Sequence, residues 1–189
     1  MNRRQKRLAS FVVAVLAIGL SALGQQLGWF DDPAQKMQQN NPGFYAITRF
    51  VDGDTITVDM NGTKETVRMI GVDTPETHKP NTPVQCYGPA AAAYTKNLIG
   101  AQKVRLEADP TNQNRDRYNR LLRYVYLPDG ALVQAELVKN GYGFAYTSFP
   151  FTKKETFIML EETAKTTGKG LWANCTVTID GERKQTNNQ

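Results

Sequence analysis

The chain has 189 residues, which is enough for one domain of ordinary size plus appendages. Its formal net charge is +5, but four of its 23 basic residues lie at the extreme N-terminus, at Arg3, Arg4, Lys6 and Arg7. Without these four, 19 basic residues face 18 acidic ones, so overall charge does not indicate an anionic partner. The single histidine, His78, excludes a site built on two or more histidines.

Residues 1–30 form a predicted targeting segment. Basic residues precede an uncharged run from Leu8 to Gly24, where Ala22-Leu23-Gly24 is a candidate cleavage site. The run continues without charge to Phe30 and is long enough to span a bilayer. The segment is therefore either a cleaved signal peptide or an uncleaved signal-anchor helix. Both options place the rest of the chain outside the cell, either secreted or tethered to the outer face of the membrane.

A folded domain is predicted over residues 44–175, after a polar linker at 31–43 that is rich in Gln, Asn, Pro and Asp. Apolar and polar residues alternate in its first part, which is typical of half-buried strands. Asn61-Gly62 predicts a type I′ hairpin turn. The strands expected here cover residues 44–51, 55–60 and 64–72.

The second part of the domain is predicted to contain three helices and two more strands. Pro89 begins the first helix and Gly100 ends it, whereas Thr152 and Glu155 match a capping box at the start of the third. The expected helices cover residues 89–100, 131–140 and 152–167, and the expected strands 103–108 and 121–127. This order predicts an α+β fold, a five-stranded OB-fold-type β-barrel with three flanking helices. Residues 176–189 are expected to be a frayed polar tail.

Two cysteines, Cys86 and Cys175, lie in the part of the chain that is predicted to be exported. An even number of cysteines in an oxidising compartment favours a disulfide, which would contribute ~4 kcal/mol in the chain-entropy model. Two unrelated thiols are the alternative.

The residues that could carry chemistry gather at predicted strand ends. Asp54 follows the first strand, and Arg68, Asp73, Thr74 and Glu76 lie on or just after the third. Carboxylate and carbonyl oxygens are the ligands that Ca²⁺ prefers, and a further carboxylate and an arginine suit attack on a phosphodiester. Each of these residues also has an ordinary structural interpretation, as a turn residue or as one member of a surface ion pair.

A second cluster mixes basic and aromatic residues in the loop at 114–120. Arg117, Tyr118 and Arg120 lie there, and Tyr146 belongs to another aromatic group near residue 150. Such interleaving is typical of surfaces that place cations on phosphates and rings under bases. A solvated loop is the alternative.

Taken together, these blocks resemble the staphylococcal nuclease (thermonuclease) family from about residue 47 to residue 172. The resemblance rests on four strings in the family's order: Asp52-Gly-Asp-Thr55, Arg68 with Val72-Asp-Thr-Pro-Glu-Thr77, Tyr87-Gly-Pro89, and Arg115-Asp-Arg-Tyr-Asn-Arg120.

The resemblance implies a monomeric, Ca²⁺-dependent enzyme that hydrolyses DNA and RNA with little sequence preference and leaves 3′-phosphate ends. In such an enzyme a metal-activated water attacks the phosphorus. The implied roles are Asp54, Asp73 and the Thr74 carbonyl for calcium, Arg68 and Arg120 for the phosphate, Glu76 as general base, and Arg117, Tyr118 and Tyr146 for the nucleotide.

Two positions depart from the family pattern. Asn119 replaces a glycine, and asparagine can also adopt the left-handed conformation. Ser148 stands near the place of a second base-stacking tyrosine, so the base pocket differs. Two other functions remain as alternatives: a catalytically inactive nucleic-acid-binding OB-fold module, and a membrane-tethered adhesion or assembly domain. Neither explains why all five key acidic and basic positions are filled.

Overall fold

The computed structural model describes residues 43–77, 83–181 and 183–188. The chain divides into two units, Met1–Pro42 and Gly43–Gln189, so the second unit begins one residue before the predicted domain. The predicted targeting segment, the linker up to residue 42 and His78 lie outside the described residues. Among the helices that are described, none has both the length and the apolar character needed to cross a bilayer.

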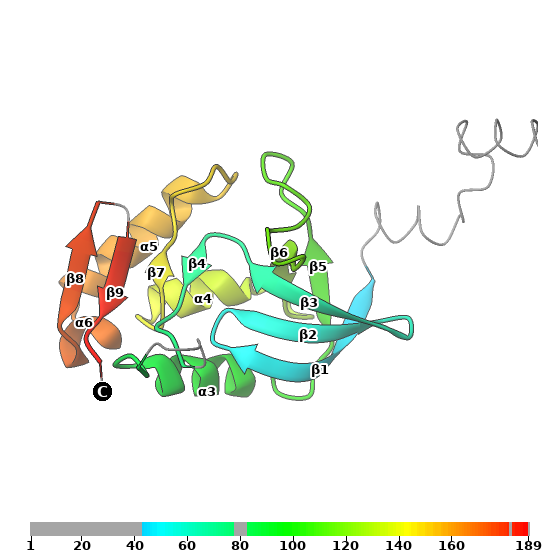
Figure 1. The fold of residues 1–189 in the computed structure, drawn as a ribbon, viewed down its shortest axis with the longest axis horizontal. Coiled ribbons are helices and arrows are strands. Elements are labelled where there is room, and N and C mark those ends of the chain that lie inside the picture. Colours follow the sequence, from blue (N-terminus) through cyan, green and yellow to red (C-terminus); the bar gives the residue numbers. More distant parts are fainter. Residues whose placement is uncertain (1–42, 78–82, 182, 189) are drawn as a thin grey trace, which may run out of the picture. The chain divides into compact units, whose positions relative to one another are not determined.

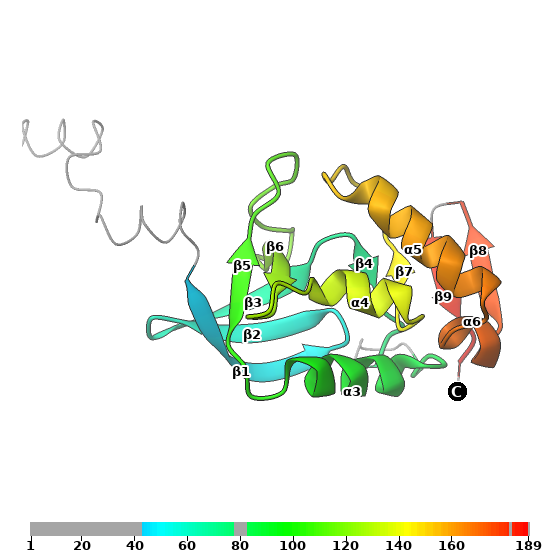
Figure 2. The ribbon, with the colours of Figure 1, turned by 180° about the vertical axis from the view of Figure 1, so that it is seen from behind.

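Five strands form a closed barrel in the order β1-β2-β3-β6-β5 (Figures 1 and 2). β3 and β6 pair in parallel and the other neighbours pair antiparallel, so the barrel is mixed. The predicted α+β class and the five-stranded barrel are confirmed. The barrel strands are β1 (Phe44–Asp52), β2 (Thr55–Met60), β3 (Thr63–Met69), β5 (Val104–Glu107) and β6 (Leu121–Tyr126).

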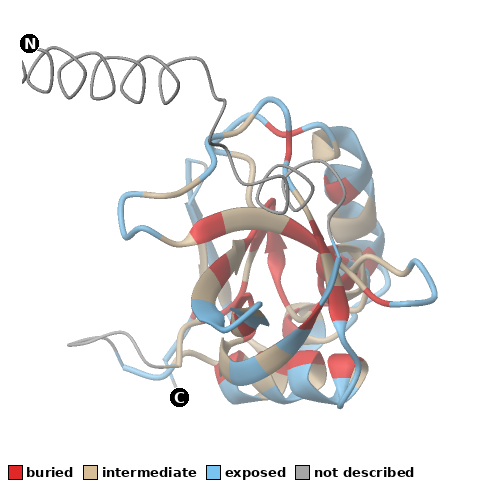
Figure 3. Ribbon diagram, turned by 90° about the vertical axis from the view of Figure 1, so that its right-hand side faces the viewer, coloured by how far each residue is buried: buried red, intermediate tan, exposed pale blue. Residues whose placement is uncertain are grey.

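The core of the barrel follows from the alternation in the sequence. Ile56 and Val58 on β2 and Val67 and Met69 on β3 are almost completely buried. Figure 3 shows buried and partly exposed segments following one another along the strands. The β2–β3 turn has positive φ at both Asn61 and Gly62, as its sequence predicts.

One predicted strand is in fact two. The expected strand at 64–72 is divided into β3 and the short β4 (Val72–Asp73), which pairs with β7 (Phe144–Ala145) outside the barrel. The break lies at Gly71, which has a φ of 76°. A Cβ at this position would also lie 2.7 Å from the Phe151 ring, so only glycine fits both the turn and the packing.

The three predicted helices are present as α3 (Gly88–Ile99), α4 (Val133–Lys139) and α5 (Lys154–Thr166), and a single turn, α6 (Leu171–Asn174), follows them. The predicted capping box at the start of α5 is wrong. The N-cap is Lys153, without a side-chain cap, because the Thr152 hydroxyl donates instead to Asp109 Oδ2 at 2.7 Å. α5 therefore begins two residues later than predicted.

The prediction of a frayed tail at 176–189 is also wrong. β8 (Val177–Asp180) and β9 (Arg183–Thr186) form an antiparallel hairpin, which lies at the end of the domain beside α5 and α6 (Figures 1 and 2). The expected disulfide is present between Cys86 and Cys175 and ties the base of this hairpin to the start of α3. Apart from Thr186, no residue described in the two strands is fully buried. The prediction overlooked the alternation Val177-Thr178-Ile179-Asp180 and the turn residues Asp180-Gly181, which together are typical of a hairpin.

Candidate active site

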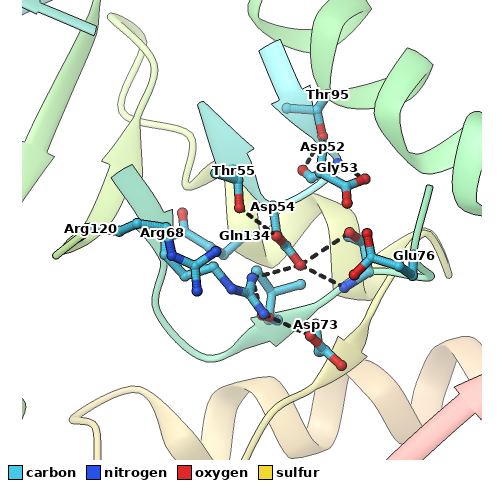
Figure 4. A network of polar contacts seen from close by, with 12 residues as sticks. Asp52, Gly53, Asp54, Thr55, Arg68, Asp73, Glu76, Thr95, Arg120 and Gln134 are labelled. Carbon is cyan, nitrogen blue, oxygen red and sulfur yellow. Dashed lines mark hydrogen bonds and ion pairs between the residues drawn. The ribbon is translucent and has the colours of Figure 1, made fainter. Parts of the chain in front are cut away.

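Asp54 lies at the centre of a polar cluster at one end of the barrel, where the β1–β2 turn meets the segment after β4 (Figure 4). Only 6% of the residue is exposed. Thr74 donates its backbone N–H and its hydroxyl to Asp54 Oδ2, at 2.8 and 3.0 Å, and the Thr55 hydroxyl donates to Oδ1 at 2.9 Å. The carboxylate is therefore fixed in orientation from both sides.

The turn that carries Asp54 is bound to α3 by a hydrogen bond. The Thr95 hydroxyl, which is fully buried, donates to the Gly53 carbonyl at 2.6 Å. A Cβ on Gly53 would lie 2.8 Å from Thr74 Oγ1, so a side chain there would push the two segments apart. The close approach of Asp54 and Thr74 thus depends on a glycine between the two aspartates of the turn.

Arg68 joins the two predicted metal-ligating carboxylates. Its guanidinium lies 2.6 Å from Asp54 Oδ2 and 2.6 Å from Asp73 Oδ1, and it also donates to the Val72 carbonyl at 2.9 Å. Burial alone would lower the pKa of Arg68, but the attraction of Asp54 and Asp73 raises it above its ordinary value. The structure therefore brings Asp54, Arg68, Asp73 and Thr74 into one cluster.

Asp52 belongs to the same cluster and was not assigned a role from the sequence. Its Oδ1 accepts hydrogen bonds from Gly53 N and from the Thr77 hydroxyl, at 2.8 and 3.0 Å. Burial and the repulsion of Asp54 raise the pKa of Asp52 to about 7, and a hydrogen bond with Glu76 contributes to the rise. The Asp-Gly-Asp string was the signal for this residue, because the turn brings both carboxylates to the same strand junction.

The cluster contains three acidic side chains, Asp52, Asp54 and Asp73, and one basic side chain, Arg68. Burial raises the pKa of Asp73, with Arg68 acting in the opposite direction and Asp54 adding to the rise. Carboxylate oxygens, a backbone carbonyl and water are the ligand set of a hard cation such as Ca²⁺, so the donor chemistry of Asp54, Asp73 and Thr74 fits one. Within the described ranges, no group of three or more His, Cys, Asp or Glu side chains surrounds a common point. A cation here would therefore need ligands from outside these side chains.

The second predicted arginine is held by a partner that the sequence did not reveal. Arg120 donates from Nε to Asp116 Oδ2 at 2.7 Å, its Nη2 lies 2.6 Å from the same atom, and its backbone N–H donates to Oδ1. Asn119 has a φ of 64°, the left-handed turn that its sequence allows. The parallel register pairs Arg68 with Leu122, and Figure 4 shows Arg68 and Arg120 on the same side of the cluster.

The predicted nucleotide-binding residues lie at two places. Tyr118 is 64% exposed, with the guanidinium groups of Arg117 and Arg120 at 4.8 and 5.4 Å from its ring centre. Tyr146 follows β7, and its N–H donates to the Gly71 carbonyl at 2.9 Å, directly before β4. Its ring centre lies 5.9 Å from that of the exposed Phe149, another member of the aromatic group near residue 150.

The comparisons with known proteins agree on one family. Residues 66–174 match the family described as staphylococcal nuclease homologue. The chain is 44% identical over 135 residues to a thermonuclease of Staphylococcus hyicus, covering 71% of this chain and 78% of that protein. It is 43% identical over 154 residues to a thermonuclease of Staphylococcus intermedius, covering 81% and 89%. It is also 46% identical over 129 residues to the endonuclease YncB of Bacillus subtilis, covering 67% and 60%.

Proposed function

The chain belongs to the staphylococcal nuclease family, and from this premise we propose that it is a Ca²⁺-dependent nuclease that hydrolyses phosphodiester bonds of DNA and RNA. The observation that best supports the proposal is the position of Arg68, whose guanidinium lies 2.6 Å from both Asp54 and Asp73. An arginine beside two fixed carboxylates combines a phosphate-binding group with ligands for a divalent cation. We also propose that the barrel is of the OB type.

Each of the candidate side chains would have its own role in the reaction. Asp54, Asp73 and the Thr74 carbonyl would hold Ca²⁺, which supplies positive charge next to the phosphate and polarises the attacking water. Arg68 and Arg120 would each donate two N–H bonds to phosphate oxygens and neutralise the charge that develops as the bond breaks. Glu76, next to the cluster, would accept a proton from the attacking water.

Outside the reacting group, Arg117 and Tyr118 would bind the phosphate and sugar of the nucleotide, and Tyr146 would stack on its base. Direct base-edge contacts are not part of this scheme, so little sequence preference is expected. Because the Cys86–Cys175 disulfide is stable only in an oxidising compartment, we propose that the protein works outside the cytoplasm, secreted or tethered to the outer face of the membrane. We expect a monomer.

A cleavage assay tests the proposal directly. The full chain is incubated with plasmid DNA and with RNA, in calcium and in a chelator, and the products are separated on a gel. We expect both substrates to be degraded in calcium and neither in the chelator. Binding without cleavage in calcium would instead favour an inactive nucleic-acid-binding module, and cleavage in the chelator would contradict the calcium site.

A further inference from the structure

The β8–β9 hairpin lies beyond residue 174, where the match to the family ends. It nevertheless reaches two segments that carry candidate active-site residues. One contact is made to β7, which pairs with β4 and Asp73, and the other to the strand-like segment at Gln85 and Cys86, which lies against Glu76.

The first contact is a clamp on one residue of β7. Glu161 Oε1 accepts the Ala145 N–H at 2.9 Å, and Lys184 of β9 donates to the Ala145 carbonyl at 3.2 Å. Lys184 also forms an ion pair with Glu161, and their side chains are only 17% and 12% exposed. Ala145 pairs with Val72, and Phe144 pairs with Asp73. The clamp therefore holds the strand that positions Asp73.

The second contact is a matching clamp on Glu76. The Gln85 side chain accepts the Glu76 N–H at 2.8 Å, and the Gln85 N–H donates to the Glu76 carbonyl at 2.9 Å. The hairpin secures the next residue, because Cys86 N–H donates to the Asn187 carbonyl at 2.7 Å and the Thr186 hydroxyl donates to the Cys86 carbonyl at 2.8 Å. The disulfide to Cys175 anchors Cys86 covalently at the base of the same hairpin.

We propose that the β8–β9 hairpin is a brace that positions residues 73–76 for phosphodiester cleavage, with Lys184 and Gln85 as its positioning residues; this rests on the function proposed above. On one side, Glu161 and Lys184 together bind the N–H and the carbonyl of Ala145 on β7. On the other side, Gln85, next to the hairpin-bound Cys86, binds the N–H and the carbonyl of Glu76.

Neither Lys184 nor Gln85 needs to touch the substrate. Lys184 fixes the strand that pairs with Val72 and Asp73. Gln85 fixes the backbone of Glu76. A misplacement of 1 Å is enough to lower a rate strongly.

The test compares Lys184→Met with Lys139→Met in the full, oxidised chain. Lys139 is a matched control, because it also pairs with a glutamate of a helix, Glu136, but on α4 and at 50% exposure. For Lys184→Met we expect kcat on single-stranded DNA to fall about 10-fold with little change in KM, and Lys184→Arg to recover most of it. Lys139→Met should behave like the wild type.

A second measurement does not depend on turnover. Ca²⁺ titrated into each protein without substrate should bind about 10-fold more weakly to Lys184→Met than to Lys139→Met. Groups that orient the ligands of a metal without binding it typically affect its affinity by at least this amount. If Lys184→Met does not fold, Gln85→Met leaves the hairpin intact and should show the same loss of kcat, with the exposed Gln102→Met as its control.

The outcomes separate the brace from the proposed function. A wild-type chain that cleaves no nucleic acid would refute the function. A cleaving wild type whose Lys184→Met and Gln85→Met variants keep wild-type kcat and calcium affinity would refute the brace alone. A loss of kcat that Lys184→Arg does not recover, or that only follows the fraction of unfolded protein, would also overturn it.

Discussion

Asp54 and Asp109 are two buried aspartates of the same domain, 6% and 4% exposed. In both, a threonine from a distant segment donates its backbone N–H and its hydroxyl to one carboxylate oxygen. Thr74 does so for Asp54 at 2.8 and 3.0 Å, and Thr152 does so for Asp109 at 2.7 Å in both bonds. The same local arrangement thus orients both carboxylates.

Their surroundings differ. Asp109 receives further bonds from Thr111 and from the Tyr124 hydroxyl, all neutral donors, and these outweigh burial and lower its pKa. Asp54 instead shares its site with Asp52 and Asp73 around one guanidinium, and the pKa of Asp52 is raised. Asp109 is satisfied by neutral donors and stabilises the fold, whereas Asp54 belongs to a group of three aspartates with a single arginine. Carboxyls whose pKa values are raised by burial and by neighbouring carboxylates are typical of functional sites, and this contrast is the reason to place the proposed cation at Asp54 and Asp73 rather than at Asp109.

Removing Arg68 should have the largest effect, because its guanidinium lies 2.6 Å from both Asp54 and Asp73. For Arg68→Ala we expect kcat to fall about 10³-fold, the usual loss when a preorganised charge donor is removed. Calcium should at the same time raise the Tm of Arg68→Ala more than that of the wild type, since the cation then faces two unpaired carboxylates.

The control for this prediction is Arg105→Ala, which breaks the Arg105–Glu107 ion pair on β5, away from the cluster. A surface pair of this kind contributes less than about 1 kcal/mol, and kcat should not change. Near wild-type cleavage by Arg68→Ala would contradict its proposed role on the phosphate.

At Asp109 we expect the opposite result, a large loss of stability with little change in kcat. Asp109→Ala should lower the free energy of unfolding by about 4 kcal/mol, because buried hydroxyl and N–H donors lose their charged acceptor, while kcat of the folded fraction should stay near wild type. Since the folded pKa of Asp109 lies below its ordinary value, its stabilisation is complete above about pH 5 and is lost as the pH falls through the lowered pKa. Urea unfolding at pH 7 and at pH 3 measures both effects. Equal losses at the two pH values would contradict this account.

Much of the fold could be predicted, because its barrel obeys local rules. The alternation in β2, the Asn61-Gly62 turn and the apolar positions of the helices each reflect a regular period or a required backbone angle. The hairpin at 177–186 was missed, although Val177-Thr178-Ile179-Asp180 alternates and Asp180-Gly181 is a hairpin turn signal. What holds it against the rest of the domain is a disulfide, the Lys184 ion pair and the buried Thr186 hydroxyl. Such contacts have no period in the sequence.

The candidate site divides in the same way. Asp54, Arg68 and Asp73 were predictable because each stands at a strand end, and strand ends of a small barrel meet. The partners of Arg120 and Glu76 were not predictable. Asp116 beside Arg120 and Gln85 beside Glu76 are polar residues in irregular segments, and only the folded chain shows which of many such residues makes the contact. Thr152 misled for a similar reason, since its hydroxyl could cap a helix or bind Asp109, and only the latter is observed.

The smallest expected effect is a pH dependence of stability that is caused by Asp52. Asp52 has a folded pKa of about 7 and an unfolded pKa of about 3.9, so between these pH values its carboxyl is protonated in the folded chain and ionised in the unfolded chain. Because the folded state binds the extra proton, the free energy of unfolding should fall as the pH rises through this range. In a chelator, the free energy of unfolding of the wild type should fall by about 1 kcal/mol between pH 5 and pH 6, and that of Asp52→Asn should fall much less.

The exposed Asp180→Asn serves as the control and should keep the wild-type slope of unfolding free energy against pH. Calcium should flatten the wild-type slope, because a bound cation favours the ionised carboxylates. A slope that Asp52→Asn leaves unchanged would mean that the excess charge resides elsewhere in the cluster, and the contrast with Asp109 would then rest on Asp73.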